Sequence, residues 1–307
     1  MVKHYTNFNI KKIHRGSIIL IGNFDGLHLG HQKLFQLAQS YKKKYNLKIG
    51  VVNFDPMPKM FFNKKLKNFR LTNIDQKIKL LSSFKVDFVI TKKFDKKFSK
   101  IKAVNFIIKI FSKKLSSKFI FVSNNFRFGN KREGNVNLLI KYEKLLDYKV
   151  VKPEPLIKIK KIVSSSLIRN LLENGFLDKA NNLLNRNWTI QGIVKKGRQV
   201  GKKIGFPTCN IDIKDYVLAK PGVYAVKVLR KNSTKYIKGI ANLGYRPTFN
   251  QKKILLEVHL FNFSGNLYNK LLSVEFLKFI RKEKKFKNVN QLRAQIKKDL
   301  NIAKKTK

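Results

Sequence analysis

In the stretch SIILIGNFDGLHLGH, residues 17–31, an apolar run leads into a loop with three glycines. A short apolar run bounded by glycine predicts a buried strand. Behind the loop, apolar side chains recur at helical spacing, at Leu34, Leu37, Ala38 and Tyr41. The stretch therefore predicts a strand, a glycine-rich loop and a helix in succession. In open α/β sheets, ligands bind beyond the carboxyl end of such a strand, near the free amides of a helix N-terminus.

The loop also carries two histidines, His28 and His31, which are three residues apart. A lone histidine at such a position commonly caps a helix or packs in the core. On a first helical turn, residues i and i+3 share one face, so two rings can reach the same small anion. Asp25 has two interpretations, as a metal ligand or as a turn-forming residue. The three glycines that allow the backbone to approach a ligand are Gly22, Gly26 and Gly30.

A formal net charge of +51 arises from 68 lysines and arginines against 17 acidic residues. Such a charge suits a protein that binds nucleic acid by releasing counterions. However, the lysines are spread over nearly every segment, and only eleven of the basic residues are arginine, the residue favoured for bidentate contacts. Lys, Asn, Ile, Phe and Tyr share AT-rich codons, so genomic base composition accounts for the charge at least as well as selection for binding does. We expect no specific nucleic-acid partner and keep a lysine-rich nucleic-acid-binding protein as the less favoured alternative.

Length and composition indicate a folded protein with two domains. The 307 residues suffice for two cores, and 43% of them are hydrophobic. No apolar run approaches the roughly 18 residues that span a bilayer, and residues 1–16 lack the apolar centre of a signal peptide. A single cysteine, Cys209, excludes an intramolecular disulfide and suits a reducing compartment. These features predict a cytoplasmic protein with no membrane partner, and they do not indicate an oligomeric state.

The order of patterns along the chain divides it near residue 187. From Ser17 to about Asn185, predicted strands alternate with predicted helices, which favours a Rossmann-like α/β domain with a parallel sheet covered on both faces. From Trp188 onward, short alternating segments separated by turn residues favour an antiparallel β-domain that closes into a barrel. A helical pattern over residues 288–305 follows. We therefore predict one domain over residues 1–186 and a second over residues 187–307.

Within the first domain, the patterns predict four strands beyond the first, over residues 48–56, 84–94, 119–129 and 147–155. Helices are expected between them, over residues 73–84, 103–111 and 135–146. The helix over 73–84 places Ile74, Ile78 and Leu81 on one apolar face.

Several stretches resemble, in order and spacing, the motifs of the prokaryotic bifunctional riboflavin kinase/FAD synthetase family. The H-x-G-H of residues 28–31 resembles the nucleotidylyltransferase signature, and the wider GNFDGLHLGHQKL resembles the opening of this family. The further stretches are VVNFDPMPKMFF (51–62), VSNNFRFGNKREGN (122–135), VSSSLIRNLLENG (163–175), GRQVGKKIGFPTCNID (197–212) and LLEVHLFNF (255–263). The resemblance implies a nucleotidylyltransferase-type α/β domain followed by a riboflavin kinase barrel with a C-terminal helix. It also implies a bifunctional transferase that uses ATP and Mg²⁺ to convert riboflavin to FMN, and FMN to FAD with release of pyrophosphate.

For the first domain, the resemblance implies direct attack of the FMN phosphate on the α-phosphorus of ATP. His28 and His31 would stabilise the pentacoordinate phosphate, and Arg169 would hold the departing pyrophosphate. Ser165 and Ser166 begin a predicted helix, where hydroxyls cap free amides with or without a ligand. The residues expected near the ATP phosphates are Gly22, Phe24, Asp25, Gly30, Ser165 and Ser166. Those expected near the flavin are Phe54, Pro56, Pro58 and Phe62, as an apolar wall, and Asn125, as a hydrogen-bonding partner.

The second domain resembles the riboflavin kinase motif at a glycine-rich loop that leads into Pro-Thr-x-Asn. Gly201 and Gly205 allow backbone amides to approach the phosphates of ATP. Thr208 and Asn210 offer the hard oxygen ligands that Mg²⁺ prefers, and their i, i+2 spacing on a strand puts both side chains on one face.

Two glutamates are candidates for the general base of the kinase. By resemblance, Glu257 takes the proton of the riboflavin 5′-hydroxyl, for which an ionised carboxylate within hydrogen-bond reach suffices. Glu275 has a similar apolar strand setting, so the residues alone leave both open. The resemblance also implies that Arg281 and the segment to Phe286 form a flap and a wall on the flavin side.

Three positions depart from the family pattern. Met57 stands where histidine is frequent, Ser123 where glycine is usual, and Asn135 where an acidic residue is expected. None of them lies in the H-x-G-H or at Arg169, so we expect FAD formation to survive with altered flavin affinity. A riboflavin kinase with an impaired adenylyltransferase half stays open as an alternative.

Overall fold

The chain folds into two compact units, each of which is described by itself. The first contains Met1–Lys67 and Ile74–Ser164, and the second contains Asn68–Asn73 and Ser165–Lys307. None of the helices in the part of the chain that the structure describes is both long enough and apolar enough to span a membrane. The structure is a computed structural model that describes residues 2–158, 160–197, 201, 204–213, 215–248 and 251–306.

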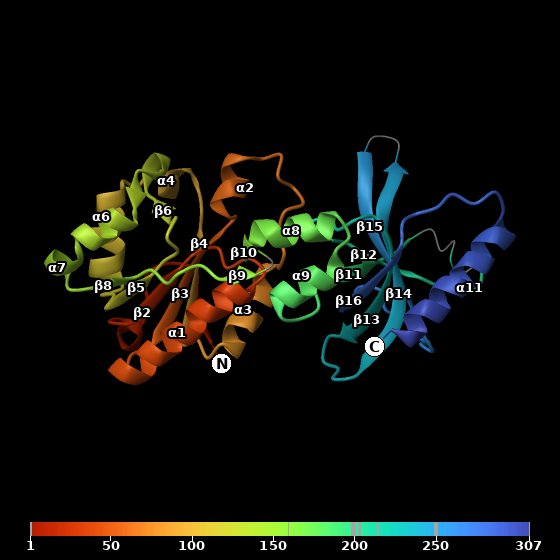
Figure 1. Cartoon of the computed structure of the whole chain (residues 1–307), viewed down its shortest axis with the longest axis horizontal. Helices are drawn as coiled ribbons and strands as arrows, with labels where there is room; N and C mark the ends of the chain where they lie inside the picture. The colour runs from red at the N-terminus through yellow and green to blue at the C-terminus, as the bar shows by residue number, and fades with distance from the viewer. Residues whose placement is uncertain are drawn as a thin grey trace. The chain divides into compact units, whose positions relative to one another are not determined.

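The first unit is built on a six-stranded sheet in which every neighbouring pair is parallel (Figure 1). The predicted parallel sheet is therefore confirmed, and it is extended at one edge by a short strand, β1, that the sequence patterns did not indicate. In spatial order the strands are β1 (Lys3–Tyr5), β4 (Phe88–Lys93), β3 (Ile49–Asp55), β2 (Ile18–Ile21), β5 (Phe119–Phe121) and β8 (Lys149–Val151).

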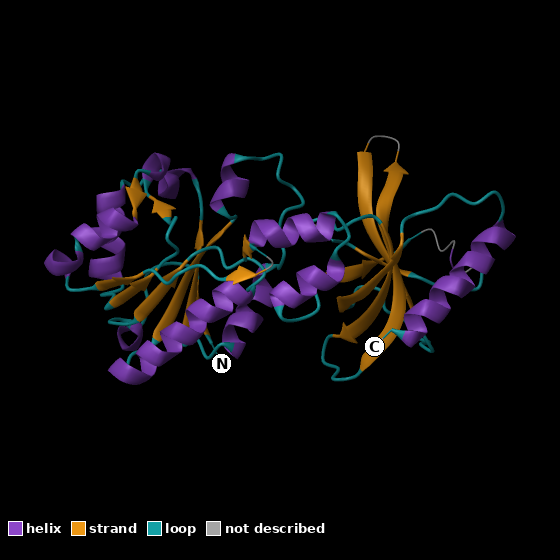
Figure 2. Cartoon of the chain, in the orientation of Figure 1, coloured by secondary structure: helices purple, strands orange, loops and turns teal. Residues whose placement is uncertain are grey.

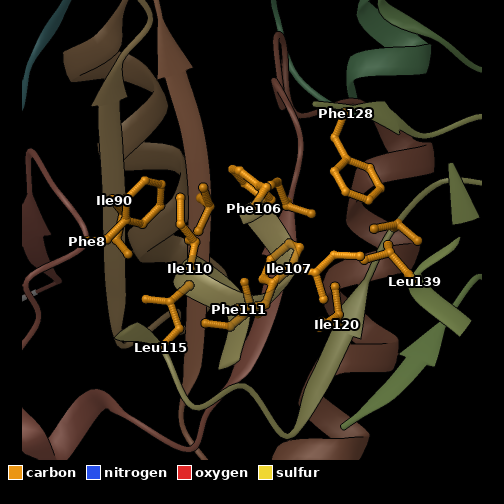
Figure 3. Packing of buried hydrophobic residues seen from close by; sticks show 14 of the residues in the cluster. Phe8, Ile90, Phe106, Ile107, Ile110, Phe111, Leu115, Ile120, Phe128 and Leu139 are labelled. Atoms are coloured by element: carbon orange, nitrogen blue, oxygen red, sulfur yellow. The ribbon is translucent and has the colours of Figure 1, made fainter. Parts of the chain in front are cut away.

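The central strands β2 and β3 are buried on both faces, because helices cover both faces of this sheet. One core gathers Phe35 and Ala38 of α1 with Leu81 of α3. The other gathers Phe106 of α5 and Phe111 of the π-helix η2, among the residues drawn in Figure 3. The longer helices are α1 (Leu29–Tyr45), α2 (Pro58–Phe62), α3 (Ile74–Ser83), η2 (Ile107–Lys114) and α6 (Val136–Lys141). The shorter elements are η1 (Lys12–His14), α4 (Lys96–Ser99), α5 (Ala103–Phe106), β6 (Arg127–Phe128), η3 (Asn130–Arg132), β7 (Gly134–Asn135), α7 (Glu143–Leu146), β9 (Ile157–Lys158) and β10 (Lys161–Ile162).

The strand order places the loop between β2 and α1 at a special point of the sheet. After β2 the chain adds β3 and β4 on one side, and then returns to add β5 on the other side of β2. The direction of winding therefore reverses at β2. In open α/β sheets, such a reversal opens a crevice at the carboxyl ends of the strands, where ligands bind.

The second unit contains a closed six-stranded antiparallel barrel, which confirms the predicted β-domain (Figure 2). The helix α11 packs against β13, β14 and β16 of this barrel. Around the barrel the strands are β11 (Thr189–Lys195), β12 (Cys209–Ile211), β15 (Gln251–Leu260), β14 (Tyr236–Thr248), β13 (Gly222–Arg230) and β16 (Leu271–Arg281). Among the residues of this unit that the structure describes, the helices with given bounds are α8 (Ser165–Glu173), α9 (Leu177–Leu184) and α11 (Val289–Lys305).

Candidate active sites

The loop between β2 and α1 brings its two histidines into direct contact. His28 is the N-cap of α1, where its Nδ1 accepts a hydrogen bond of 3.4 Å from the backbone amide of His31. The two rings stack, with their centroids 3.7 Å apart and their planes inclined by 20°. Gly30 makes this possible, because a Cβ there would lie 3.2 Å from both His28 Nδ1 and the carbonyl oxygen of Val163.

The imidazole of His31 is held in its neutral form. Its Nδ1 atom is buried and has no hydrogen-bond partner among the described residues. Burial lowers the pKa of His31 well below its usual value, and the nearby His28 and Lys77 lower it further. A neutral ring of this kind stabilises an anion by donating a hydrogen bond rather than by carrying a charge.

The loop backbone adopts conformations that side chains usually avoid. Phe24 and Leu27 have φ values of 46° and 40°, and Gly26 has a φ of 81°. Each non-glycine residue in the left-handed region costs about 1–2 kcal/mol, so the surrounding packing must hold the loop. The Phe24 ring is buried against His31, with centroids 5.2 Å apart, and thus supports the imidazole from behind. Asp25, expected near the phosphates, is also buried.

Two buried polar residues near this loop escaped the sequence analysis. Lys77 of α3 is only 1% exposed, and its Nζ donates a 2.8 Å hydrogen bond to the carbonyl oxygen of Asn23 in the loop. The sequence does contain a signal for its burial, since Lys77 falls on the apolar face predicted for this helix. Asn53 of β3 is fully buried, and neither polar atom of its carboxamide has a partner among the described residues. Its neighbour Val51 two residues back packs in the core with Phe24, so Asn53 points to the sheet face that carries α1.

The expected flavin-side residues lie in a cluster of aromatic rings. Phe54 packs against Phe94 and Phe98, with centroids 5.9 and 5.5 Å apart. Phe61 and Phe62 of α2 pack against Phe94 in turn, and Phe62 leaves 68% of its surface exposed. Phe54 and Phe62 were predicted from the sequence, whereas the three rings between them, Phe61, Phe94 and Phe98, were not.

The positions around that cluster have structural roles of their own. Pro58 begins α2, and Met57, one of the departures from the family pattern, is the buried residue before it. Pro56 follows β3 directly. Ser123 Oγ donates a 2.9 Å hydrogen bond to Oδ1 of Asn125, so the departure at Ser123 engages the side chain expected to contact the flavin. Asn135 caps α6 by accepting from the amide of Leu138, a role that an acidic residue would also fill.

Arg169 is held rigidly within the second unit. It lies on α8, four residues after Ser165 opens that helix and three after the exposed Ser166. Its Nε donates a 2.6 Å hydrogen bond to the carbonyl oxygen of Phe69, and its guanidinium stacks 3.7 Å from the Phe69 ring centroid. The two histidines belong to the first unit and Arg169 to the second, so their convergence on one ATP stays a prediction.

The barrel of the second unit carries a cavity of about 460 Å³. This volume lies in the range of roughly 300–1,000 Å³ that is typical of small-molecule sites. Several predicted site residues line it together: Gly201, Thr208, Glu257 and Arg281. Phe206, Ile240 and Phe286 are among the apolar residues of its wall. Gly205 lies in the same loop with a φ of 87°, while residues 198–200, 202 and 203 of the loop lie outside the described residues.

Asn210 and Thr208 fit the requirements of a magnesium site. Asn210 is 7% exposed, and its Oδ1 is buried with no hydrogen-bond partner among the described residues. It lies directly opposite Glu257 in the register of β12 and β15, so both side chains are on the same face of the barrel wall. Gly197 leaves room for the Asn210 carboxamide, since a Cβ there would lie 1.6 Å from Nδ2. A Cβ at Gly201 would lie 3.2 Å from Thr208 Oγ1.

The two candidate bases differ in their surroundings. Glu257 lines the cavity. The carboxylate of Glu275 instead accepts a 2.5 Å hydrogen bond from Tyr236 Oη and lies 3.1 Å from Lys227 Nζ. The hydrogen bond to Glu275 raises the pKa of Tyr236 to about 12, with burial as the second cause. Glu257 lines the cavity and Glu275 is not among the described residues that line it, so the geometry favours Glu257.

Arg281 lines the cavity, but its guanidinium is already engaged. Its Nε lies 2.9 Å and its Nη2 2.6 Å from Oδ2 of Asp299, which is 1% exposed on α11. Gln295 Nε2 donates to the other oxygen of Asp299 at 2.8 Å. Arg281 therefore ties α11 to β16 and shapes the wall.

His259 is a cavity residue that sequence analysis missed. It lines the wall two residues beyond Glu257, on the same strand face, and its Nδ1 is 2.8 Å from the carbonyl oxygen of Pro207. The period-two alternation of β15 was the signal that could have identified it. The hydrogen bond anchors the loop that presents Thr208.

Known proteins match both halves of the chain. The FAD synthetase family model matches residues 10–167, and the riboflavin kinase family model matches residues 184–307. A bifunctional riboflavin kinase/FMN adenylyltransferase from Buchnera aphidicola subsp. Schizaphis graminum is 42% identical over 300 residues, which cover 97% of this chain and 96% of the relative. A relative of the same name from Haemophilus influenzae is 40% identical over 296 residues, with 96% of each chain covered.

One solved structure is similar over the whole chain. A Streptococcus pneumoniae chain described as a macrolide-efflux protein matches with a TM-score of 0.88 and 26% identity, over 100% of this chain and 99% of the other. Family models, relatives and site geometry agree on one family. The chain belongs to the bifunctional riboflavin kinase/FMN adenylyltransferase family.

Proposed function

We propose that this chain phosphorylates riboflavin with ATP to give FMN and ADP, and then transfers the adenylyl group of a second ATP to FMN, giving FAD and pyrophosphate. The observation that carries the proposal is the cavity in the barrel, which Glu257 and Thr208 line, with the buried Asn210 directly opposite Glu257 in the register of β12 and β15. We assign adenylyl transfer to residues 1–186 and the kinase reaction to residues 187–307.

In the kinase reaction, the carboxylate of Glu257 accepts the proton of the riboflavin 5′-hydroxyl as its oxygen attacks the γ-phosphorus of ATP. The bond from the γ-phosphorus to the bridging oxygen breaks, and ADP departs. Thr208 Oγ1 and Asn210 Oδ1 would hold Mg²⁺, which when bound neutralises charge on the phosphates. Gly201 and Gly205 let the loop backbone approach those phosphates. The apolar wall with Arg281 excludes water from the transferred group.

In the adenylyl transfer, an oxygen of the FMN phosphate attacks the α-phosphorus of ATP. No general base is required, because a phosphate monoester is already ionised. His28 and His31 donate hydrogen bonds to the oxygens that gain charge, and Arg169 holds the departing pyrophosphate. The free amides at the start of α1, with Gly22 and Gly30, bring the loop backbone close to the phosphates.

The remaining predicted residues take supporting roles in the same reaction. Phe54 and Phe62, with Pro56 and Pro58 between them, offer an apolar surface for the isoalloxazine, and Asn125 offers its Nδ2 as a donor. Phe24 and Asp25 shape the phosphate loop from its buried side, while Ser165 and Ser166 cap the helix that carries Arg169.

One alternative keeps the kinase and weakens the second reaction. The hydroxyl of Ser123 donates a hydrogen bond to Oδ1 of Asn125, so this oxygen is less available as an acceptor for the flavin. A Ser123→Gly variant releases that oxygen. A lower KM for FMN in the variant than in the wild type would support this alternative.

A chromatographic time course of the purified protein with riboflavin, ATP and Mg²⁺ tests the proposal. We expect FMN to rise first and then to convert to FAD. FMN that accumulates without FAD would leave only the kinase assignment. If neither product forms, both assignments are wrong, and the salt dependence of duplex binding then tests the nucleic-acid alternative.

A further inference from the structure

The loop between β2 and α1, which carries the two histidines, is hydrogen-bonded to the buried ammonium group of Lys77. Lys77 of α3 is 1% exposed, and its Nζ donates a 2.8 Å hydrogen bond to the carbonyl oxygen of Asn23. Burying an ammonium group is costly unless it is hydrogen-bonded or paired, so this position is a specific one. The neighbouring lysine on the same helix, Lys79, is exposed in the usual way.

The hydrogen bond acts where the loop is strained. The carbonyl that Lys77 holds belongs to the residue just before Phe24, whose φ is 46°, and Leu27 follows with a φ of 40°. Such conformations persist only where the surroundings fix them. The ring of Phe24 in turn packs on His31, so a displaced Asn23 carbonyl would move the support of the imidazole.

The ammonium also acts through its charge. Lys77 is near enough to His31 to disfavour a second positive charge there, together with burial and His28. The charged and titratable groups around His31 are thus His28 and Lys77, with Asp25 buried in the same loop. An anionic phosphate that enters this loop meets the neutral ring of His31 beside His28, with the ammonium group of Lys77 nearby.

We propose that Lys77 is a positioning residue for adenylyl transfer, which clamps the loop between β2 and α1 and supplies the fixed positive charge behind His28 and His31. This inference rests on the proposed FMN adenylyltransferase function. The clamp and the charge are separable, because a glutamine keeps a donor for the Asn23 carbonyl and loses the charge, whereas an arginine keeps both.

The test compares four variants in the full-length chain: Lys77→Arg, Lys77→Gln, Lys77→Met and the control Lys79→Met. Steady-state FAD formation from FMN and ATP gives kcat and KM for each. We expect kcat to fall about tenfold or more in Lys77→Gln and further in Lys77→Met, with recovery in Lys77→Arg and no change in Lys79→Met. FMN formation from riboflavin, measured on the same samples, should stay at the wild-type rate in all four.

A second readout follows the His31 ring by NMR titration of the protein without substrates. The pKa of His31 should rise in Lys77→Gln and stay low in Lys77→Arg. This readout tests the role of Lys77 even if the wild type makes no FAD. The absence of FAD formation in the wild type would overturn the proposed function and not the effect of Lys77 on His31. A wild-type kcat in Lys77→Met would overturn the proposal as a whole.

Two further outcomes separate the role of the Lys77 charge from misfolding of a variant. A wild-type kcat in Lys77→Gln, with an unchanged His31 titration, would overturn the role of the charge. If Lys77→Met loses FMN formation as well, the variant is misfolded, and the comparison of Lys77→Gln with Lys77→Arg decides.

Discussion

Replacing Gly197 by alanine should disable the kinase reaction through one side chain. A Cβ at Gly197 would lie 1.6 Å from Nδ2 of Asn210, whereas ordinary van der Waals contact begins near 3.4 Å. The carboxamide must therefore move by the difference, about 1.8 Å. The φ of Gly197 is not in the left-handed region, so the alanine backbone is tolerated.

The displacement is large compared with what a magnesium ligand tolerates. Mg²⁺ requires near-ideal octahedral geometry at about 2.0–2.1 Å, so a shift of this size removes the Asn210 oxygen from the site. A lost charge-assisted contact is worth about 1.5–3 kcal/mol, which corresponds to an increase of roughly 10- to 100-fold in the KM for Mg·ATP.

The assay is FMN formation over a range of Mg·ATP concentrations, together with Mn²⁺ binding in the presence of ATP followed by electron paramagnetic resonance. Gly16→Ala is the control, because a Cβ there also meets no atom within 4 Å and tests only the strain of a φ of 71°, at a position outside both proposed sites. FAD formation from FMN should be unaffected in both variants. A normal KM and normal Mn²⁺ binding in Gly197→Ala would refute the reasoning that Asn210 is a metal ligand.

Three further predictions concern other parts of the molecule. Glu257→Gln should abolish FMN formation and spare FAD formation from supplied FMN, whereas Glu275→Gln should keep the kinase turnover; the reverse pattern would move the base to Glu275. Asp299→Asn removes the carboxylate from the Arg281 guanidinium, whose side chain is only 15% exposed, so the barrel should lose about 3–5 kcal/mol of unfolding free energy in urea melts. A loss below about 1 kcal/mol would contradict a buried pair. The pKa of His31 in the folded protein is lowered from 6.5, so the stability that neutral His31 contributes is complete above pH 6.5 and is lost as the pH falls below 6.5 toward the lowered pKa. The difference in unfolding free energy between the wild type and His31→Gln should therefore shrink over that interval. A difference that is independent of pH would show that His31 titrates normally.

Local sequence patterns were sufficient for most of the longer elements and for the family motifs, but they did not indicate the short strand β1. The apolar run before Gly22 forms β2, and the helical spacing after it forms α1 with His28 at its N-cap. The alternation after Trp188 forms the strands of the barrel. These features depend on residues within a few positions of one another, which is why period and turn chemistry identify them.

The sequence also determined most of the chemistry offered at each site. H-x-G-H, Pro-Thr-x-Asn and the Glu257 segment supply imidazole, hydroxyl, amide and carboxylate groups of the kinds the two reactions need. It left Glu257 and Glu275 open, since both sit among apolar strand residues. Their surroundings differ only through contacts with other strands, such as that between Glu275 and Lys227.

Only the tertiary structure decided how these groups are supported. Lys77 reaches a carbonyl 54 residues earlier in the chain, and Arg281 is neutralised by Asp299 from the last helix. Asn53 faces α1 because β3 lies beside β2, and the β2–α1 loop lies at a switch point because β5 returns to the other side of β2. Strand order and helix placement bring together residues that no local pattern relates, and they set which charges are buried. The sequence therefore determined which groups are present, whereas the packing of distant segments decided their protonation, their strain and their partners.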